Sequence, residues 1–153
     1  NDEQRGFLRT LFHLHAPHMG DNNMYSNDFS QENLFKFQSD AIRKAAQESS
    51  CVFVGRCADY VLRDYPNVVN VFVTADMDFR IDQVMHKQNI GREEARKFIE
   101  NGESKRAAYY NYYTGKKWGH ASSYDLCIDS SKLGLQATER IIADFIRKYL
   151  DLD

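Results

Sequence analysis

Residues 68–75 read VVNVFVTA, a short and almost continuously apolar run. Residues 51–55, CVFVG, have the same character and end at a glycine, and residues 124–129 read YDLCID. Short apolar runs without polar alternation are typical of strands that are buried on both faces of a parallel sheet. The sequence therefore predicts three parallel strands, and these runs decide the fold class.

Stretches with helical periodicity separate the predicted strands. The expected helices cover residues 30–48, 59–63, 76–88, 92–113 and 134–150. Ser30 is expected to cap the first helix, and Gly102 is a candidate break in the fourth. Apolar residues expected to face the core from the first and last helices are Leu34, Phe37, Ile42, Ala45, Ala46, Leu135, Ile141, Ile142, Phe145 and Ile146.

Alternation of strands and helices predicts an α/β fold with a parallel sheet and right-handed crossovers. Ligands in such sheets bind at the carboxyl ends of the strands. Residues 55–56, 74–76 and 129–131 are therefore the places where a site is expected.

Composition bounds the class of protein. The 153 residues, 42% hydrophobic and 27% charged, fit one globular domain. A net charge of −2 argues against non-specific nucleic-acid binding. No apolar run approaches the about 20 residues that cross a bilayer, and no export signal opens the chain. Three cysteines without a CxxC pair indicate a reduced, cytoplasmic protein, with Cys51 and Cys127 as small core hydrophobes.

Gly55-Arg56 follows directly on the first apolar run. Glycine allows a ligand close to the backbone, and the planar guanidinium of Arg56 suits a phosphate or a carboxylate. The alternative is a structural arginine at a strand end, paired with Asp59 or Asp64. Position along the chain does not separate these two interpretations.

Cationic residues crowd the middle of the chain. They are Arg80, His86, Lys87, Arg92, Arg96, Lys97, Lys105 and Arg106. Most are expected on a solvated helix face, where Glu93, Glu94, Glu100 and Glu103 can form i,i+4 pairs. The functional alternative is a mobile arm that carries arginines onto a polyphosphate, because phosphoryl transfer needs such donors.

Two further patterns bear on metal binding and on phosphate binding. His13, His15 and His18 form HLHAPH, which has metal-binding spacing but no completing carboxylate or cysteine, so a solvated loop is expected. No G-x-x-x-x-G-K-[ST] run occurs, so the chain has no phosphate-cradling loop of its own.

Four stretches, CVFVGRCADYVL, NVFVTADMDFRIDQVM, RAAYYNYYTGKKWG and YDLCIDSSKLG, together resemble the cytidylate kinase-like family of P-loop nucleoside monophosphate kinases. The resemblance runs in order from about residue 31 to the C-terminus, and the tyrosine-rich motif is its most specific part. It implies a three-layer P-loop kinase sandwich, and transfer of the γ-phosphoryl of ATP, with Mg²⁺, to a nucleoside monophosphate such as CMP or dCMP.

The resemblance also assigns residues. Arg56 would bind the phosphate of the acceptor, and Asp59 is assigned to the same substrate site. Arg106, Arg80 and Arg96 would act on the transferred phosphoryl group. Glu103 would orient Arg106 or contact the acceptor sugar. Lys105 and Tyr109 would contact the acceptor, and Asp129, Ser130 and Ser131 would lie beside the adenine. No metal ligand is assigned. Cys57 stands where true cytidylate kinases have an aspartate, which leaves the acceptor open.

The same resemblance places the missing P-loop strand in the middle of the sheet, between residues 51–55 and 68–75. The expected layout is one partial domain: a variable helix and loop (1–30), core (31–90), a lid-like arm (91–114) and core (115–153). Because the chain begins with Asn1 and not Met, we expect the missing segment upstream or on another polypeptide. A homodimer is left open.

Two readings of function follow. The first is a nucleotide kinase whose activity requires the upstream P-loop, and the second is a non-catalytic nucleotide-binding or interaction module of the same fold. Single-stranded RNA binding through the Lys/Arg/Tyr stretch is a third option, against which the acidic net charge counts. The tyrosines are expected either to pack a helix end or to line the rim of the site.

Overall fold

The computed structural model describes residues 24–152. The chain divides into two compact units, residues 1–36 and 37–153, and the second unit carries both strands that the structure describes. The HLHAPH motif and most of the variable helix and loop predicted for residues 1–30 lie outside the described residues.

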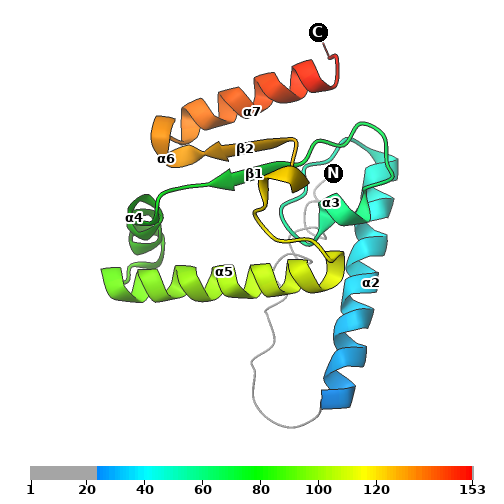
Figure 1. The fold of residues 1–153 in the computed structure, drawn as a ribbon, viewed down its shortest axis with the longest axis horizontal. Helices are drawn as coiled ribbons and strands as arrows, with labels where there is room; N and C mark the ends of the chain where they lie inside the picture. Colours follow the sequence, from blue (N-terminus) through cyan, green and yellow to red (C-terminus); the bar gives the residue numbers. More distant parts are fainter. Residues whose placement is uncertain (1–23, 153) are drawn as a thin grey trace. The chain divides into compact units, whose positions relative to one another are not determined.

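Two of the predicted strands pair in parallel. Strand β1 (Val71–Thr74) lies beside β2 (Leu126–Asp129), with Val71 opposite Leu126 and Thr74 opposite Asp129 (Figure 1). Both strands are shorter than the apolar runs that predicted them. Their carboxyl ends lie at the same edge, because the pair is parallel. An α/β arrangement is therefore present, but its sheet has two strands in the part of the chain that the structure describes.

The prediction of a buried strand at residues 51–55 is wrong for the described structure. This segment has no strand pairing, and the side chains of Val52 and Val54 are 94% and 80% exposed. A strand requires a hydrogen-bonded neighbour for its backbone N–H and C=O groups. No described segment supplies one here, so an apolar sequence is left extended and open.

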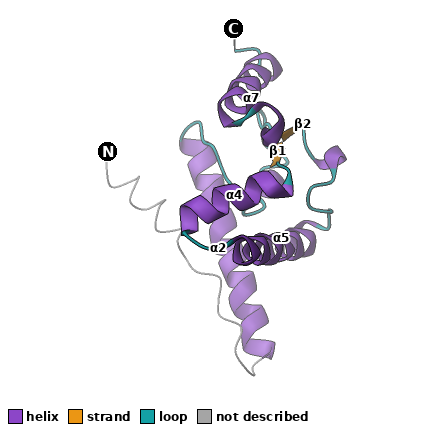
Figure 2. Ribbon diagram, turned by 90° about the vertical axis from the view of Figure 1, so that its left-hand side faces the viewer, coloured by secondary structure: helices purple, strands orange, loops and turns teal. Residues whose placement is uncertain are grey.

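The helices follow the predicted order, and Figure 2 distinguishes them by colour from the strands and loops. They are α2 (Met24–Glu48), α3 (Ala58–Val61), α4 (Met77–Gln88), α5 (Arg92–Thr114), the 3₁₀ turn η1 (Ala121–Ser123), α6 (Ser130–Leu133) and α7 (Leu135–Tyr149).

Three helix limits differ from the prediction. Helix α2 begins at Met24, so Ser30 lies inside it and is not its N-cap. Helix α5 runs through Gly102 without a break. The last predicted helix, 134–150, is α7, but an unpredicted short helix, α6, precedes it, and Gly134 separates the two with a positive φ of 82° that no regular helix accommodates.

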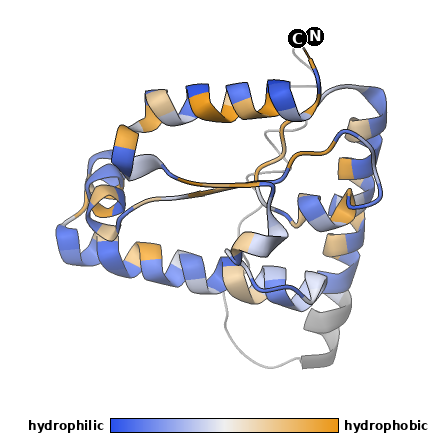
Figure 3. Ribbon diagram, turned by 45° about the horizontal axis from the view of Figure 1, so that its top comes forward, coloured by the Kyte–Doolittle hydropathy of each residue, from blue (hydrophilic) through white to orange (hydrophobic). Residues whose placement is uncertain are grey.

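Helices α4 and α5 have a small core of their own. Ile81 and Ala95 are fully buried and Ile99 is 6% exposed, with Met77 and Val84 among the residues packed around them. Elsewhere α5 presents mainly hydrophilic residues, while the strand pair is largely hydrophobic (Figure 3). The predicted lid-like arm is thus packed against α4.

The apolar face expected on α7 is only partly covered. Leu135 and Ile141 are 58% and 38% exposed, contrary to prediction. A four-residue strand spans about 13 Å, whereas the 15 residues of α7 extend about 22 Å. Two short strands cannot cover such a helix. On α2, Ile42 is buried as expected, but Phe37 is 55% and Leu34 38% exposed.

The cysteines are distributed differently from the prediction. Cys51 and Cys127 are exposed, and Cys57 is the buried one, at 3% exposure. All three are free thiols. No helix within residues 24–152 is both long enough and apolar enough to span a bilayer.

Candidate functional site

A strained loop carries Arg56. Gly55, Arg56 and Cys57 have φ values of 70°, 56° and 56°, all in the left-handed region, immediately before α3. Two successive non-glycine residues in this region are uncommon and persist only where surrounding structure holds them. Such backbone outliers cluster at functional sites, so this loop is the leading candidate.

The Arg56 guanidinium has no counterion within the described chain. The residue is half-buried, yet it forms no hydrogen bond or ion pair with another described residue. The two carboxylates that could have paired with it are engaged elsewhere. Asp59 accepts a hydrogen bond from the Tyr110 hydroxyl at 2.6 Å, and Asp64 lies 3.8 Å from the Arg63 Nε atom. The structural pairing weighed above is therefore absent, and a cation is left available to an anion.

The tyrosines of the YYNYY motif lie at the end of α5, and two of them, Tyr109 and Tyr110, bond residues outside that helix. The Tyr109 hydroxyl donates to Gln38 Oε1 on α2 at 3.1 Å, while Tyr110 bonds α3 through Asp59. The ring of Tyr113 lies 4.7 Å from that of Tyr109. Burial, with smaller contributions from Cys57 and Tyr113, raises the pKa of Tyr109 to about 12, and the nearby Arg56 opposes this shift. Tyr109 is therefore beside the arginine loop, as a substrate-contacting residue would have to be.

The three arginines predicted to act on the phosphoryl group have partners of their own. Arg80 forms an ion pair with Glu103, joining α4 to α5. The Arg106 guanidinium lies 5.7 Å from the centre of the Trp118 ring, a cation–π distance. Arg96 is 3.9 Å from Glu100, the i,i+4 pair typical of a solvated helix face.

These arginines do not converge on Arg56 within the described residues. Glu103, assigned to the acceptor, instead neutralises Arg80. Lys105 is exposed on α5. The roles assigned to the arm stay predictions, and Glu103, Arg96 and Arg106 would have to leave their present partners to perform them.

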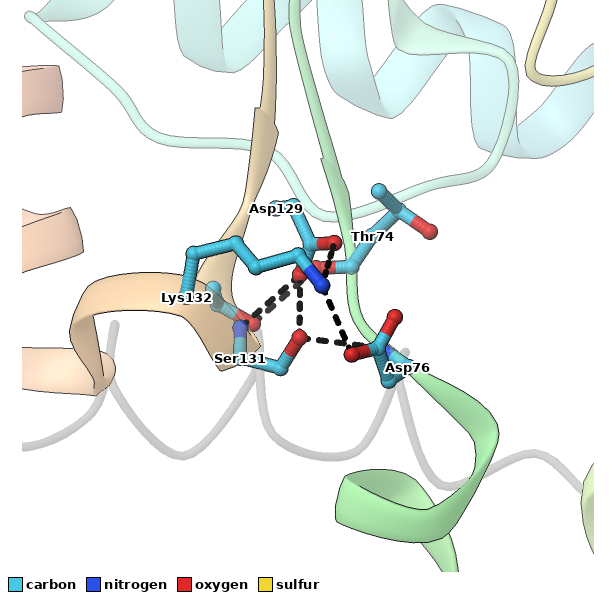
Figure 4. Close-up of polar contacts among 6 residues, drawn as sticks. Thr74, Asp76, Asp129, Ser131 and Lys132 are labelled. Carbon is cyan, nitrogen blue, oxygen red and sulfur yellow. Dashed lines mark hydrogen bonds and ion pairs between the residues drawn. The ribbon is translucent and has the colours of Figure 1, made fainter.

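A polar cluster closes the carboxyl ends of the strands (Figure 4). Asp129 Oδ1 accepts hydrogen bonds from the Ser131 backbone N–H at 2.9 Å and from its hydroxyl at 2.5 Å. The Ser131 hydroxyl also accepts from the Asp76 N–H at 3.1 Å. Lys132 Nζ lies 2.8 Å from Asp76 and 3.8 Å from Asp129. These contacts tie the two strand ends together across 55 residues of chain.

The charges of this cluster are stabilised by one another. Hydrogen bonds from Ser131 lower the pKa of Asp129, and the bond to Asp76 raises the pKa of Lys132. Ser130 is buried and donates to the Thr74 carbonyl at 3.0 Å. Because these side chains are already paired, a nucleotide beside residues 129–131 would have to be bound by backbone atoms, and that assignment stays a prediction.

Sequence reasoning missed three residues of the arrangement. Tyr110 belongs to the tyrosine-rich motif but has no predicted role, although its side chain is buried and only 6% exposed. Gln38 and Lys132 gave no signal, since one is an ordinary helix residue and the other an ordinary surface lysine. Within residues 24–152 no group of three His, Cys, Asp or Glu side chains is placed to hold a metal ion.

Comparisons with known proteins agree with the resemblance seen in the sequence. The model of the cytidylate kinase-like family matches residues 1–132. A solved structure of an uncharacterized protein from Eubacterium ventriosum is similar, with 31% identity and a TM-score of 0.72. The match covers 78% of this chain and 66% of that one, so this chain spans just under two thirds of that protein's length. No curated protein matches significantly.

Proposed function

The chain belongs to the cytidylate kinase-like family, and we propose that the complete protein is a nucleoside monophosphate kinase in which Arg56 binds the phosphate of the acceptor. The proposed reaction moves the γ-phosphoryl group of ATP onto a CMP- or dCMP-like monophosphate. The observation that carries the proposal is a half-buried guanidinium, on a strained loop, whose neighbouring carboxylates are engaged elsewhere. An arginine fork in that situation suits a phosphate.

Residues 1–153 contain no P-loop motif. We propose that a P-loop and its strand are supplied by an upstream segment or by another polypeptide. The strand would lie between residues 51–54 and β1. Supporting this, Val52 and Val54 are open to solvent and Val73 on β1 is 50% exposed. A buried strand between them would satisfy backbone groups on both sides.

The described residues do not by themselves offer a site for Mg²⁺. When bound with ATP, the ion would neutralise charge on the phosphates. The residues of this chain would orient the acceptor through Arg56. During transfer, Arg80 would leave Glu103 and Arg106 would leave the Trp118 ring. Both guanidinium groups would then contact phosphate oxygens. Catalysis would then be mainly positioning and charge stabilisation.

The alternative is a nucleotide-binding module without transfer. The unpaired Arg56 favours binding of an anion in both cases, so binding alone does not separate them. Release of ADP from ATP and Mg²⁺, dependent on one monophosphate, is expected of the kinase. A monophosphate bound without ADP release would establish the module instead.

The experiment that tests the proposal is Arg56→Ala in the full-length protein, with monophosphate affinity measured by calorimetry. We expect a loss of about 1.5–3 kcal/mol, the value of a hydrogen bond to a charged group. Arg63→Ala is the matched control, because Arg63 is a nearby cation that stacks over the Tyr60 ring at 4.2 Å and pairs with Asp64. Equal effects of the two substitutions would remove Arg56 from the site.

A further inference from the structure

One contact beside the arginine loop has no role in the function proposed so far. The Tyr110 hydroxyl, on a side chain that is 6% exposed, donates to Asp59 Oδ2 at 2.6 Å. The bond joins the end of α5 to α3 across 51 residues of chain. A buried phenol bonded to a carboxylate is among the stronger hydrogen bonds, because the acceptor is charged.

A second tyrosine, Tyr124, acts electrostatically on the Tyr110 hydroxyl. The Tyr124 hydroxyl itself accepts from the Gly119 N–H at 3.2 Å. Gly119 in turn lies against the Phe72 ring, where a Cβ atom would come within 3.1 Å. Within the described residues, the hydrogen bond from Tyr110 to Asp59 is therefore the one polar contact of this group that reaches α3.

Asp59 is the carboxylate that could otherwise neutralise Arg56. The two residues are three positions apart, and both charges act on the thiol of Cys57, which lies between them in sequence. If the Asp59 carboxylate were released, it would be attracted to the Arg56 guanidinium three positions away. It would then compete with an incoming phosphate for that guanidinium. The Tyr110 hydroxyl instead engages this carboxylate.

We propose that Tyr110 is a positioning residue for anion binding: by holding Asp59, it fixes α3 and keeps the Arg56 guanidinium free of an internal partner. The proposal rests on the function proposed above, since it specifies how that site stays open. It also gives the tyrosine-rich motif a role that packing alone does not require.

The test removes one oxygen atom. Tyr110→Phe in the full-length protein is expected to weaken CMP binding about tenfold, which corresponds to about 1.4 kcal/mol. Tyr112→Phe is the matched control, since Tyr112 lies on the same helix but is 70% exposed. Asp59→Asn in the Tyr110→Phe background is expected to restore most of the affinity, because the released side chain no longer carries a charge. Urea unfolding of each variant separates loss of fold from loss of binding.

A second readout needs no ligand. The Arg56 Nε–Hε resonance, assigned from the spectrum of Arg56→Lys, should shift in Tyr110→Phe as the new ion pair forms and return in the double variant. An unmoved resonance, or a double variant that binds as weakly as Tyr110→Phe, would overturn the proposal. Unchanged CMP binding in Tyr110→Phe together with a loss in Arg56→Ala would overturn it while leaving the proposed function intact. If the wild-type protein binds no monophosphate, the proposed function fails, and the resonance still decides the role of Tyr110.

Discussion

Alkaline pH should destabilise this protein through the thiol of Cys57. The side chain is 3% exposed and stands in the left-handed loop beside Arg56. Burial, reinforced by the negative charge of Asp59 and opposed by Arg56, raises the pKa of this thiol from 9.0 to about 12. Folding therefore favours the neutral thiol over the thiolate.

The sign and size of the effect follow from this difference in pKa. A group whose pKa is raised on folding contributes stability that is complete below the unfolded pKa and is lost as pH rises through the folded one. The window here is pH 9 to about 12. At pH 11 the unfolded thiol is almost fully ionised and the folded one mostly neutral, and the loss relative to pH 8 is about 2–3 kcal/mol.

The assay is urea unfolding at pH 8 and pH 11 for the wild-type protein and for Cys57→Ala. Tyr109 and Tyr110 also have raised pKa values, so they add to the alkaline loss in both proteins. Only the difference between the proteins reports Cys57. We expect Cys57→Ala to lose about 2–3 kcal/mol less than wild type between the two pH values. Equal losses in both proteins would refute the reasoning, because the thiol would then be as accessible in the folded state as in the unfolded chain.

Two further outcomes are expected. Arg106→Ala should lower kcat more than it weakens ground-state binding of the acceptor, because the side chain has to leave Trp118 to reach the transferred phosphoryl group. Steady-state kinetics of the full-length protein measure both effects. A change confined to KM would contradict the prediction. Ser131→Ala should raise the pKa of Asp129 toward its ordinary value, since the Ser131 hydroxyl donates one of the hydrogen bonds that lower it. A ¹³C-carboxyl titration followed by NMR measures this pKa, with Ser122→Ala as the matched control. An unchanged pKa of Asp129 would show that the hydroxyl bond does not contribute to the shift.

Much of the secondary structure could be predicted from local pattern. The apolar runs at 68–75 and 124–129 became a parallel pair, and the limits of α4 and α5 fell within a residue or two of the prediction. Both helices end at residues in the left-handed conformation, Asn89 and Gly115, which are favoured there because a small or absent side chain tolerates it. Such limits are local and need no knowledge of the rest of the chain.

The strand at 51–55 could not be settled in this way. Its composition is as apolar as that of β1, but a strand exists only where a neighbour pairs with it. Pairing depends on segments far away in sequence, and none is present among the described residues. The side chains of Val52 and Val54 are exposed because no described segment pairs with the one that carries them.

The candidate site was likewise predictable from the sequence only in part. The sequence by itself determined that an arginine follows an apolar run and a glycine, that two aspartates stand nearby, and that tyrosines gather after the cationic arm. Only the tertiary structure decided which charges meet. Tyr110, 51 residues away, engages Asp59, and Glu103, 23 residues away, engages Arg80, so Arg56 has no counterion among the described residues. The choice among several nearby partners is made by side-chain distances of a few ångströms, and these are set by packing between elements and not by spacing along the chain.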